Sequence, residues 1–145
     1  MTNKILVGSL EQCNLPGLGI TELHVRVDTG AATSSLHVDN IEEFELDGES
    51  WIRFDIHPDI HDVQKLRRCE AKVSSRRKVK SSTATKQRRY VIETMIEMAE
   101  QHWPIQLTLT DRSEMTYLML LGREAMAGKF IVDPSLEYLL NSQAE

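Results

Sequence analysis

The sequence contains little cysteine, and its two cysteines are far apart. Cys13 and Cys69 are the whole complement in 145 residues, and neither has a second cysteine at a metal-binding or redox spacing. Cysteine-based zinc sites, iron–sulfur centres and thioredoxin-like redox sites are therefore excluded. Small secreted domains are stabilised by a framework of cysteine pairs, which this chain lacks. We therefore expect two free thiols in a reducing compartment.

Long apolar runs are also absent. A membrane-spanning helix needs about 20 apolar residues, and no segment approaches that length. Near the N-terminus the apolar block is only Ile5–Val7, whereas a signal-peptide core has roughly 7–15 apolar residues. These absences predict a cytoplasmic protein with no membrane attachment.

Neither a metal-ligand set nor a phosphate-binding glycine loop is present. His57 and His61 stand four residues apart, the spacing of neighbouring side chains on one face of a helix, and Pro58 disfavours a helix there. No cysteine or third histidine is arranged to complete a tetrahedral zinc site. Because a glycine-rich nucleotide loop is missing as well, we expect no metal and no cofactor.

Acidic residues outnumber basic residues, but the two kinds are unevenly distributed. The net charge is −5, yet the segment 65–89 contains eleven of the seventeen basic residues and a single acid, Glu70. That segment carries +10 and the rest of the chain −15. Such an asymmetry indicates partners rather than a fold, and it predicts binding to an acidic peptide, an acidic protein or a nucleic-acid backbone.

Alternating apolar and polar residues dominate the chain, whereas helical periodicity is nearly absent. Turn signals such as Asp47-Gly48 separate the short apolar runs. The pattern is typical of an all-β closed or partly closed barrel, and the length suits a single domain over 1–145 with a basic hairpin at about 65–92. Strands are predicted at 21–29, 51–56, 69–80, 88–98, 105–110, 115–121 and 130–132, with one short helix near 123–127.

The predicted strand at 21–29 runs directly into Asp28-Thr29-Gly30-Ala31, where the chain must turn sharply. An acid at such a turn can be held rigid and partly desolvated, and Gly30 lets backbone amides approach its carboxylate. Thr29 adds a hydroxyl that can lock the turn. Taken alone, however, the triplet is better explained as an ordinary β-turn.

Two segments together resemble the active site of retroviral-type aspartic proteases. Asp28–Ala31 is similar to their active-site loop, and Leu120–Arg123 is similar to the later segment that threads beside that loop and leads into a short helix. A longer series also matches in order between Leu15 and Leu139. It comprises LPGLGI, VDTGAATSSLH, DGESWIRFDI, RRYVIE, LTLTDRSEMTYLMLLGREAM and FIVDPSLEYL, and it resembles a bacterial and archaeal retropepsin-like family labelled "ATP-dependent zinc protease".

The resemblance implies a retropepsin-like acid-protease barrel that works as an aspartic-type peptidase. Aspartic chemistry needs two carboxylates that share one proton, one to activate a water and one to protonate the leaving nitrogen. The chain supplies one, so the resemblance implies a homodimer with Asp28 of each copy at a two-fold axis, and Thr29 and Gly30 completing each catalytic loop. In the viral enzymes the chain termini form the intersubunit sheet, which implies 4–10 and 137–141 here.

The resemblance also implies how a substrate is held. The basic hairpin would close over the peptide as a retropepsin flap does. Many family members are encoded near a RimK-type ligase that adds glutamates to protein tails, which implies acidic, glutamate-rich peptides as substrates. The implied substrate-binding residues are Ala31, Ser34, Lys80, Ser81, Ser82, Arg89 and Arg123.

One departure from the retroviral pattern affects Arg123. The viral relatives carry an acid just after Asp-Thr-Gly-Ala that pairs with the late arginine, and Ala32 occupies that position here. Arg123 is therefore expected to use another acid, Glu124 or Asp133, or to meet a substrate carboxylate.

A non-catalytic alternative fits the same residues. A retropepsin-fold module could bind RNA or an acidic protein through the basic hairpin. Because Tyr90 is the one aromatic residue of that hairpin, contacts to phosphates are expected rather than base stacking. An inactive protease that keeps the fold and the dimer is a third hypothesis, which the presence of both Asp28 and Arg123 disfavours.

Overall fold

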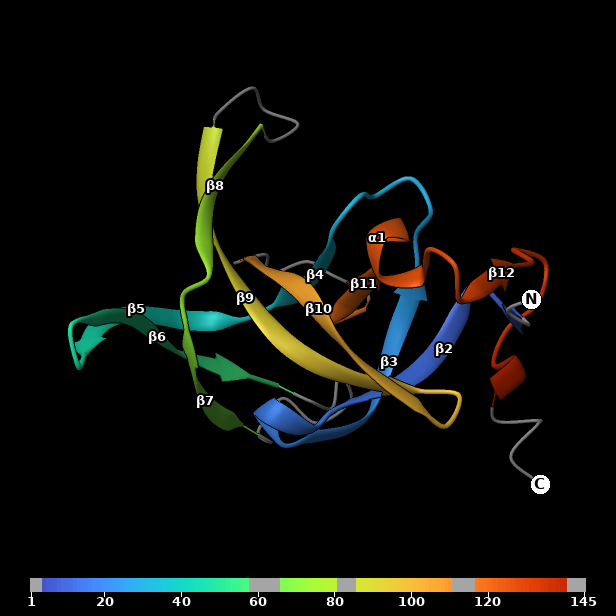
Figure 1. Ribbon diagram of the computed structural model, residues 1–145, viewed down its shortest axis with the longest axis horizontal. Helices are drawn as coiled ribbons and strands as arrows, with labels where there is room; N and C mark the ends of the chain where they lie inside the picture. The colour runs from blue at the N-terminus through green and yellow to red at the C-terminus, as the bar shows by residue number, and fades with distance from the viewer. Residues whose placement is uncertain (1–3, 58–65, 81–85, 111–116, 141–145) are drawn as a thin grey trace.

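Strands account for nearly all of the computed structural model, which describes residues 4–57, 66–80, 86–110 and 117–140 (Figure 1). Within these residues, one short α-helix and one 3₁₀ turn interrupt the strands. None of the described helices has the length and apolar character that crossing a bilayer requires. The elements are β1 (Ile5–Val7), β2 (Leu10–Leu15), η1 (Pro16–Leu18), β3 (Ile20–Val27), β4 (Ser34–His37), β5 (Asp39–Leu46), β6 (Glu49–Ile56), β7 (Arg67–Lys72), β8 (Ser75–Lys80), β9 (Lys86–Met98), β10 (Gln101–Thr110), β11 (Met119–Leu121), α1 (Arg123–Met126) and β12 (Phe130–Val132).

Six strands close into a barrel. Neighbours pair in the order β10–β4–β11–β3–β2–β9, and β9 pairs again with β10 to complete the ring. β11 runs parallel to β3 and β4 runs parallel to β10, whereas β9 and β10 form an antiparallel hairpin. The all-β barrel with one short helix that the sequence predicted is confirmed.

Strand periodicity places the core inside the barrel. In β3, Leu23, Val25 and Val27 are buried and alternate with exposed residues, as the sequence pattern predicted. On β10, Leu107 is fully buried, and the same apolar cluster continues to Phe54 of the three-stranded sheet β5–β6–β7. Because each such side chain contributes about 1.5–3 kcal/mol when removed from water, one continuous core stabilises both sheets.

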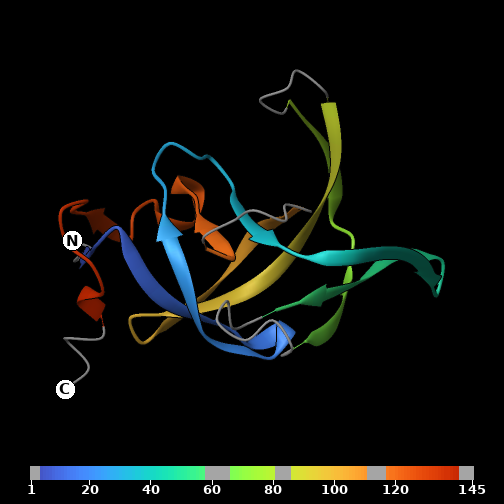
Figure 2. The ribbon, with the colours of Figure 1, turned by 180° about the vertical axis from the view of Figure 1, so that it is seen from behind.

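The strand predicted at 69–80 is instead two strands in two different sheets. β7 pairs with β6, whereas β8 pairs with β9 as one arm of the basic hairpin. The change of partner occurs between consecutive residues, because Val73 N–H donates to Ser50 O at 2.9 Å and Ser74 N–H donates to Val91 O at 2.8 Å. The hairpin therefore begins at Ser75, and Figures 1 and 2 show it rising away from the barrel while β7 stays with β6.

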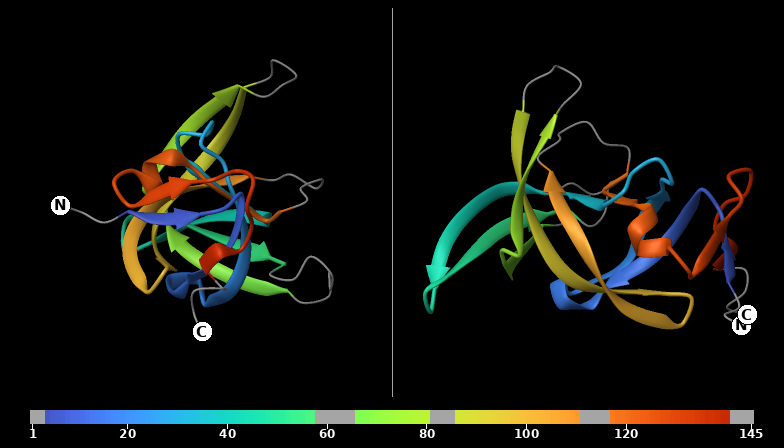
Figure 3. Two further views of the ribbon diagram at one scale, coloured as in Figure 1. Left: turned by 90° about the vertical axis from the view of Figure 1, so that its right-hand side faces the viewer. Right: turned by 45° about the horizontal axis from the view of Figure 1, so that its top comes forward.

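A buried carboxylate fixes the C-terminal segment to the start of β2. Glu11 is fully buried and accepts hydrogen bonds from the N–H groups of Gly8 at 2.8 Å, Leu139 at 3.0 Å and Leu140 at 3.2 Å. Beside this clamp, β1 pairs in parallel with β12, and Figure 3 shows these blue and red strands side by side. The residues at the two ends of the described chain are thus bonded to each other within one protomer.

Burial makes the two thiols of the protein poor nucleophiles. Cys13 is 3% exposed, and burial raises the pKa of its thiol to about 12. Burial likewise raises the pKa of Cys69. At about pH 8 we therefore expect Ellman's reagent to leave Cys13 unmodified in the folded protein and to modify it fully after unfolding in guanidinium, because only the thiolate reacts.

The same shift sets a pH dependence of stability. The unfolded Cys13 thiol ionises near its ordinary pKa of 9.0 while the folded thiol stays protonated, so the free energy of unfolding should fall as pH rises from about 9 toward 12. The slope per thiol is about 1.4 kcal/mol per pH unit, and Cys13→Ala should remove its share. Rapid labelling of Cys13 in the folded protein would contradict this assignment.

Candidate active site

The carboxylate of Asp28 lies where β3 ends and the chain turns toward β4. Asp28 N–H donates to Leu121 O at 2.9 Å, which extends the pairing of β3 with β11 into the loop. Gly30 N–H donates to Asp28 Oδ1 at 3.0 Å, and a Cβ on Gly30 would lie 3.2 Å from the same oxygen. Thr29 and Gly30 are exposed and Asp28 is partly exposed, so the acid is fixed in place and still reachable from solvent.

The chain that follows β11 holds the other end of this loop. Arg123 N–H donates to Ala31 O at 2.8 Å, and Glu124 N–H donates to Ala32 O at 3.0 Å. These are the first N–H groups of α1, which have no partner inside the helix. The arrangement expected from the resemblance, in which 120–123 threads beside the aspartate loop, is therefore confirmed.

Gly122 is the point of closest approach between the two segments. A Cβ there would lie 2.6 Å from the carbonyl carbon of Thr33 and 2.9 Å from Ala32 O, both of them backbone atoms. Gly122 N–H also donates to Ser34 Oγ at 3.0 Å. Ser34, expected to bind substrate, is only 1% exposed, so its hydroxyl serves instead to tie β4 to the residue before α1.

Arg123 stabilises the Asp28 loop through main-chain oxygens. Its Nη1 donates to Gly30 O at 3.2 Å and to Thr29 O at 3.4 Å. In the described part of the chain, neither acid considered as its partner forms an ion pair with it. Asp133 is instead bonded to the hydroxyl and N–H of Ser135, which lower the pKa of that carboxyl.

The basic hairpin reaches the loop between β3 and β4 through a residue that sequence analysis missed. Arg77 on β8 donates from Nη1 to Thr33 Oγ1 at 2.9 Å and from Nη2 to Gln106 Oε1 at 2.8 Å. Arg77 is part of the basic run in the sequence, but strand alternation alone does not say which of its arginines faces the loop.

The structure describes only part of the expected substrate-binding set on the hairpin. Arg89 lies opposite Arg77 in the β8–β9 pairing and is partly buried. Lys80 ends β8, with a side chain outside the described part, and Ser81 and Ser82 lie outside the described residues.

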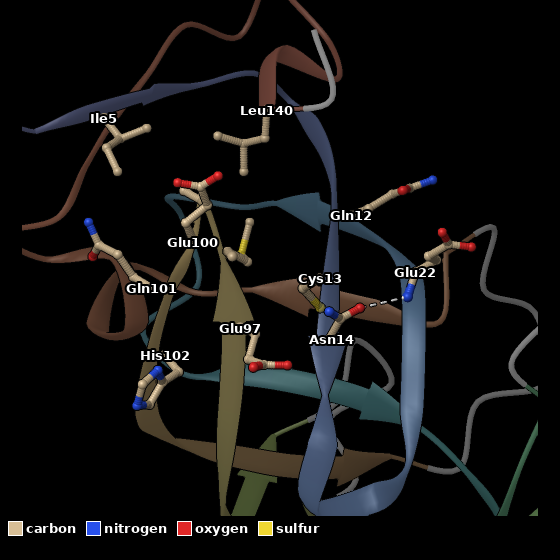
Figure 4. Close-up of a pocket in the computed structure, with 12 residues that line it drawn as sticks. Ile5, Gln12, Cys13, Asn14, Glu22, Glu97, Glu100, Gln101, His102 and Leu140 are labelled. Carbon is tan, nitrogen blue, oxygen red and sulfur yellow. Dashed lines mark hydrogen bonds between the residues drawn. The ribbon is translucent and has the colours of Figure 1, made fainter. Parts of the chain in front are cut away.

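A pocket of about 550 Å³ opens at the β9–β10 turn rather than at Asp28 (Figure 4). Ile5 and Leu140 lie on one side of it, and Glu97 and Glu100 extend from the turn region, with Cys13 on β2 nearby. No residue of the catalytic loop lines this pocket. Among the described residues, no three histidine, cysteine or acidic side chains gather as metal ligands would.

The contact at Gly122 gives a direct test of how the loop is held. Gly122→Ala should lower the free energy of unfolding by about 3 kcal/mol, the upper part of the range for overpacking, because the new Cβ meets backbone atoms. Chemical denaturation monitored by circular dichroism measures the change.

Ser34→Ala tests the same contact by removing a hydrogen bond rather than by adding an atom. It leaves Gly122 N–H without its acceptor and should cost about 1–3 kcal/mol without adding any atom. Native stability of Gly122→Ala would show that the two segments do not approach as closely as described.

Comparisons with known proteins found similar chains and one similar solved structure. A probable α-L-glutamate ligase of Shewanella pealeana is 45% identical over 99% of this chain, and one of Parasynechococcus marenigrum is 50% identical over 92%. The chain spans only 31% and 29% of those ligases. The crystal structure of a Legionella pneumophila protein of unknown function is similar with a TM-score of 0.79 and 28% identity, over 95% of this chain and 99% of that one.

The family model agrees with the geometry of the loop. The model for the retropepsin-like aspartic endopeptidase RimB matches residues 6–143, a range that includes the Asp28 loop and the α1 segment that holds it. The chain therefore belongs to the RimB-like family of retropepsin-like aspartic endopeptidases.

Proposed function

We propose that this protein is an aspartic-type peptidase that works as a homodimer and hydrolyses peptide bonds with a water activated by Asp28. The observation that carries the proposal is the Asp28 carboxylate, held by Gly30 N–H at 3.0 Å at the exposed end of β3. In the described part of the chain this carboxylate forms no ion pair. A carboxylate that is positioned by backbone groups and not neutralised by a cation retains its capacity to accept a proton from water.

The second carboxylate is proposed to come from the partner copy, because hydrolysis needs a base and an acid at once. Two carboxyl groups in contact cannot both be ionised, so one of them keeps a proton. The ionised aspartate takes a proton from water, which attacks the peptide carbonyl carbon. The protonated aspartate donates a hydrogen bond to the carbonyl oxygen and then protonates the leaving nitrogen.

An apolar surface beside the catalytic loop supports the docking of a second copy. A pocket of about 410 Å³ joins Thr29 to Met126 and Phe130. Phe130 and Val132 of β12 line the same pocket, so it extends onto one face of the β1–β12 ribbon. Because Thr29 lines this pocket, a copy that docks on it by two-fold symmetry would bring the two catalytic loops together.

Acidic, glutamate-rich peptides are the proposed substrates. Relatives of this chain are named as probable α-L-glutamate ligases, so peptides rich in the amino acid that such ligases join are a natural target for a peptidase of this family. The basic segment 65–89, with its charge of +10, supplies the complementary charge.

Substitution of the aspartate tests the peptidase directly. Asp28→Asn should reduce cleavage of a mixed peptide library, including oligoglutamate-tailed peptides, by roughly 10²–10⁴-fold, because an amide cannot serve as the base. Cleavage by the wild type should be unaffected by EDTA. Mass spectrometry of the products between about pH 4 and 8 measures both.

Asp47→Asn is the matched control, since Asp47 is an exposed aspartate at φ 52° in a hairpin turn that asparagine tolerates. Cleavage that persists in Asp28→Asn, or that stops with EDTA, would overturn the mechanism. If no protein cleaves any peptide, salt-dependent binding of RNA to the basic hairpin becomes the function to measure.

The dimer has its own test. Ala127→Asp should shift the protein from dimer to monomer in sedimentation velocity and reduce cleavage in parallel, because it puts a charge at an exposed residue that lines the pocket that contains Thr29 and each monomer holds one Asp28. Leu46→Asp, at a 44% exposed site on β5, is the control and should change neither property. A fully active monomer would contradict the proposed sharing of the site.

A further inference from the structure

A guanidinium group of the basic hairpin lies against the catalytic loop with neutral partners. Arg77 donates to the Thr33 hydroxyl at 2.9 Å and to the Gln106 side-chain oxygen at 2.8 Å. Thr33 ends the loop that begins at Asp28, and Gln106 belongs to β10, so one side chain joins three parts of the structure. Within the described residues Arg77 forms no ion pair, and it is exposed.

The neighbouring arginine already anchors the hairpin. Successive side chains of a strand point to opposite faces, and Arg76 forms an ion pair with Glu43 on β5. Its guanidinium carbon lies 5.6 Å from the ring centre of Tyr90, whose hydroxyl donates to Glu43 Oε2 at 3.1 Å. Because these contacts hold the hairpin to β5, Arg77 is available for another role.

The two partners of Arg77 are ones that a carboxylate can displace. A carboxylate accepts two parallel hydrogen bonds from a guanidinium, and such charge-assisted bonds are about twice as strong as those to a hydroxyl or an amide oxygen. Thr33 is partly exposed and Gln106 is exposed, so water can satisfy both side chains after the exchange.

The position of Arg77 suits a ligand that also reaches the aspartate loop. The β8–β9 hairpin and the loop between β3 and β4 rise from the same end of the barrel (Figures 1 and 2). The backbone of Thr33 packs closely against Gly122. A peptide whose carboxylate binds Arg77 would therefore run beside the loop between β3 and β4, which is held in place by backbone packing.

We propose that Arg77 is a specificity-determining residue, and that it binds a carboxylate of the substrate peptide in place of Thr33 and Gln106. The identity of this ligand as a peptide rests on the proposed function. The carboxylate belongs to an acidic side chain or to the C-terminus of the peptide, since both present the same group. A glutamine side chain offers only a neutral oxygen of the kind that Gln106 already supplies, so Arg77 selects acid over amide.

Binding is measured first, without turnover. In an Asp28→Asn background, fluorescence anisotropy compares a peptide with several glutamates and an amidated C-terminus, the same peptide with glutamines, and the glutamine peptide with a free C-terminus. Arg77→Gln should weaken binding of the glutamate peptide by roughly tenfold to a hundredfold, as expected for a lost charge-assisted hydrogen bond, and leave the amidated glutamine peptide unchanged. Arg77→Lys, which keeps the charge without the fork, should show an intermediate loss.

The two sources of the carboxylate are separated by the peptides. Dependence on Arg77 that follows the glutamates assigns a side chain, and dependence that follows the free C-terminus assigns the chain end. Arg76→Gln is the control for hairpin position, and it should affect the acidic and neutral peptides equally. Equal weakening of all peptides by Arg77→Gln, or no weakening of any, would overturn the proposal.

Cleavage kinetics then separate this proposal from the peptidase itself. In an otherwise wild-type protein, Arg77→Gln should raise KM for the glutamate peptide with kcat retained, because the carboxylate contact precedes the chemical step. If the wild type cleaves nothing but acid-selective binding still depends on Arg77, the peptidase fails and the carboxylate site stands. If cleavage depends on Asp28 but acid-selective binding does not depend on Arg77, the carboxylate site is wrong and the peptidase stands.

Discussion

The close approach of Gly122 to the backbone of Ala32 and Thr33 is the contact on which the candidate site depends. Only a residue without a Cβ lets the chain leaving β11 pass so near the aspartate loop. Once it passes there, the free N–H groups at the start of α1 meet the loop carbonyls, and Asp28 continues the pairing of β3 with β11. The position of the carboxylate is therefore a consequence of backbone packing, with side-chain hydrogen bonds added to it.

The same loop is the place where the basic hairpin meets the barrel, and this divides the positive charge of the chain into two classes. Arg68 pairs with Asp55 and Arg76 pairs with Glu43, so these arginines hold the sheets together. Arg77 instead contacts neutral groups of the loop and of β10. A basic run that looks uniform in the sequence thus contains arginines paired with acids and, among its described side chains, Arg77 directed at the Asp28 loop.

Local chemistry made much of the fold predictable. Alternation identified β3, β6 and β10, and the hairpin turn at Asp47-Gly48 has positive φ at both residues, 52° and 78°. The adjacency of the aspartate loop and 120–123 followed from two motifs in order. The division of 69–80 into β7 and β8 did not, because each half is a good strand and the choice of pairing partner is set by distant residues. Burial of Ser34 was missed for the same reason, since a small polar side chain suits a core or a binding site equally well.

The buried carboxylate of Glu11 constrains how two copies can share a site. In this protomer the N–H groups of Leu139 and Leu140 are already bonded to Glu11, and β1 already pairs with β12. An intersubunit sheet built from 4–10 and 137–141, as the viral resemblance implied, would have to replace these bonds, because the buried Glu11 carboxylate needs its donors. A dimer of this chain is therefore expected to dock with these bonds intact, through the pocket that contains Thr29. In that arrangement the catalytic loops meet beside Thr29 while each terminus stays with its own copy.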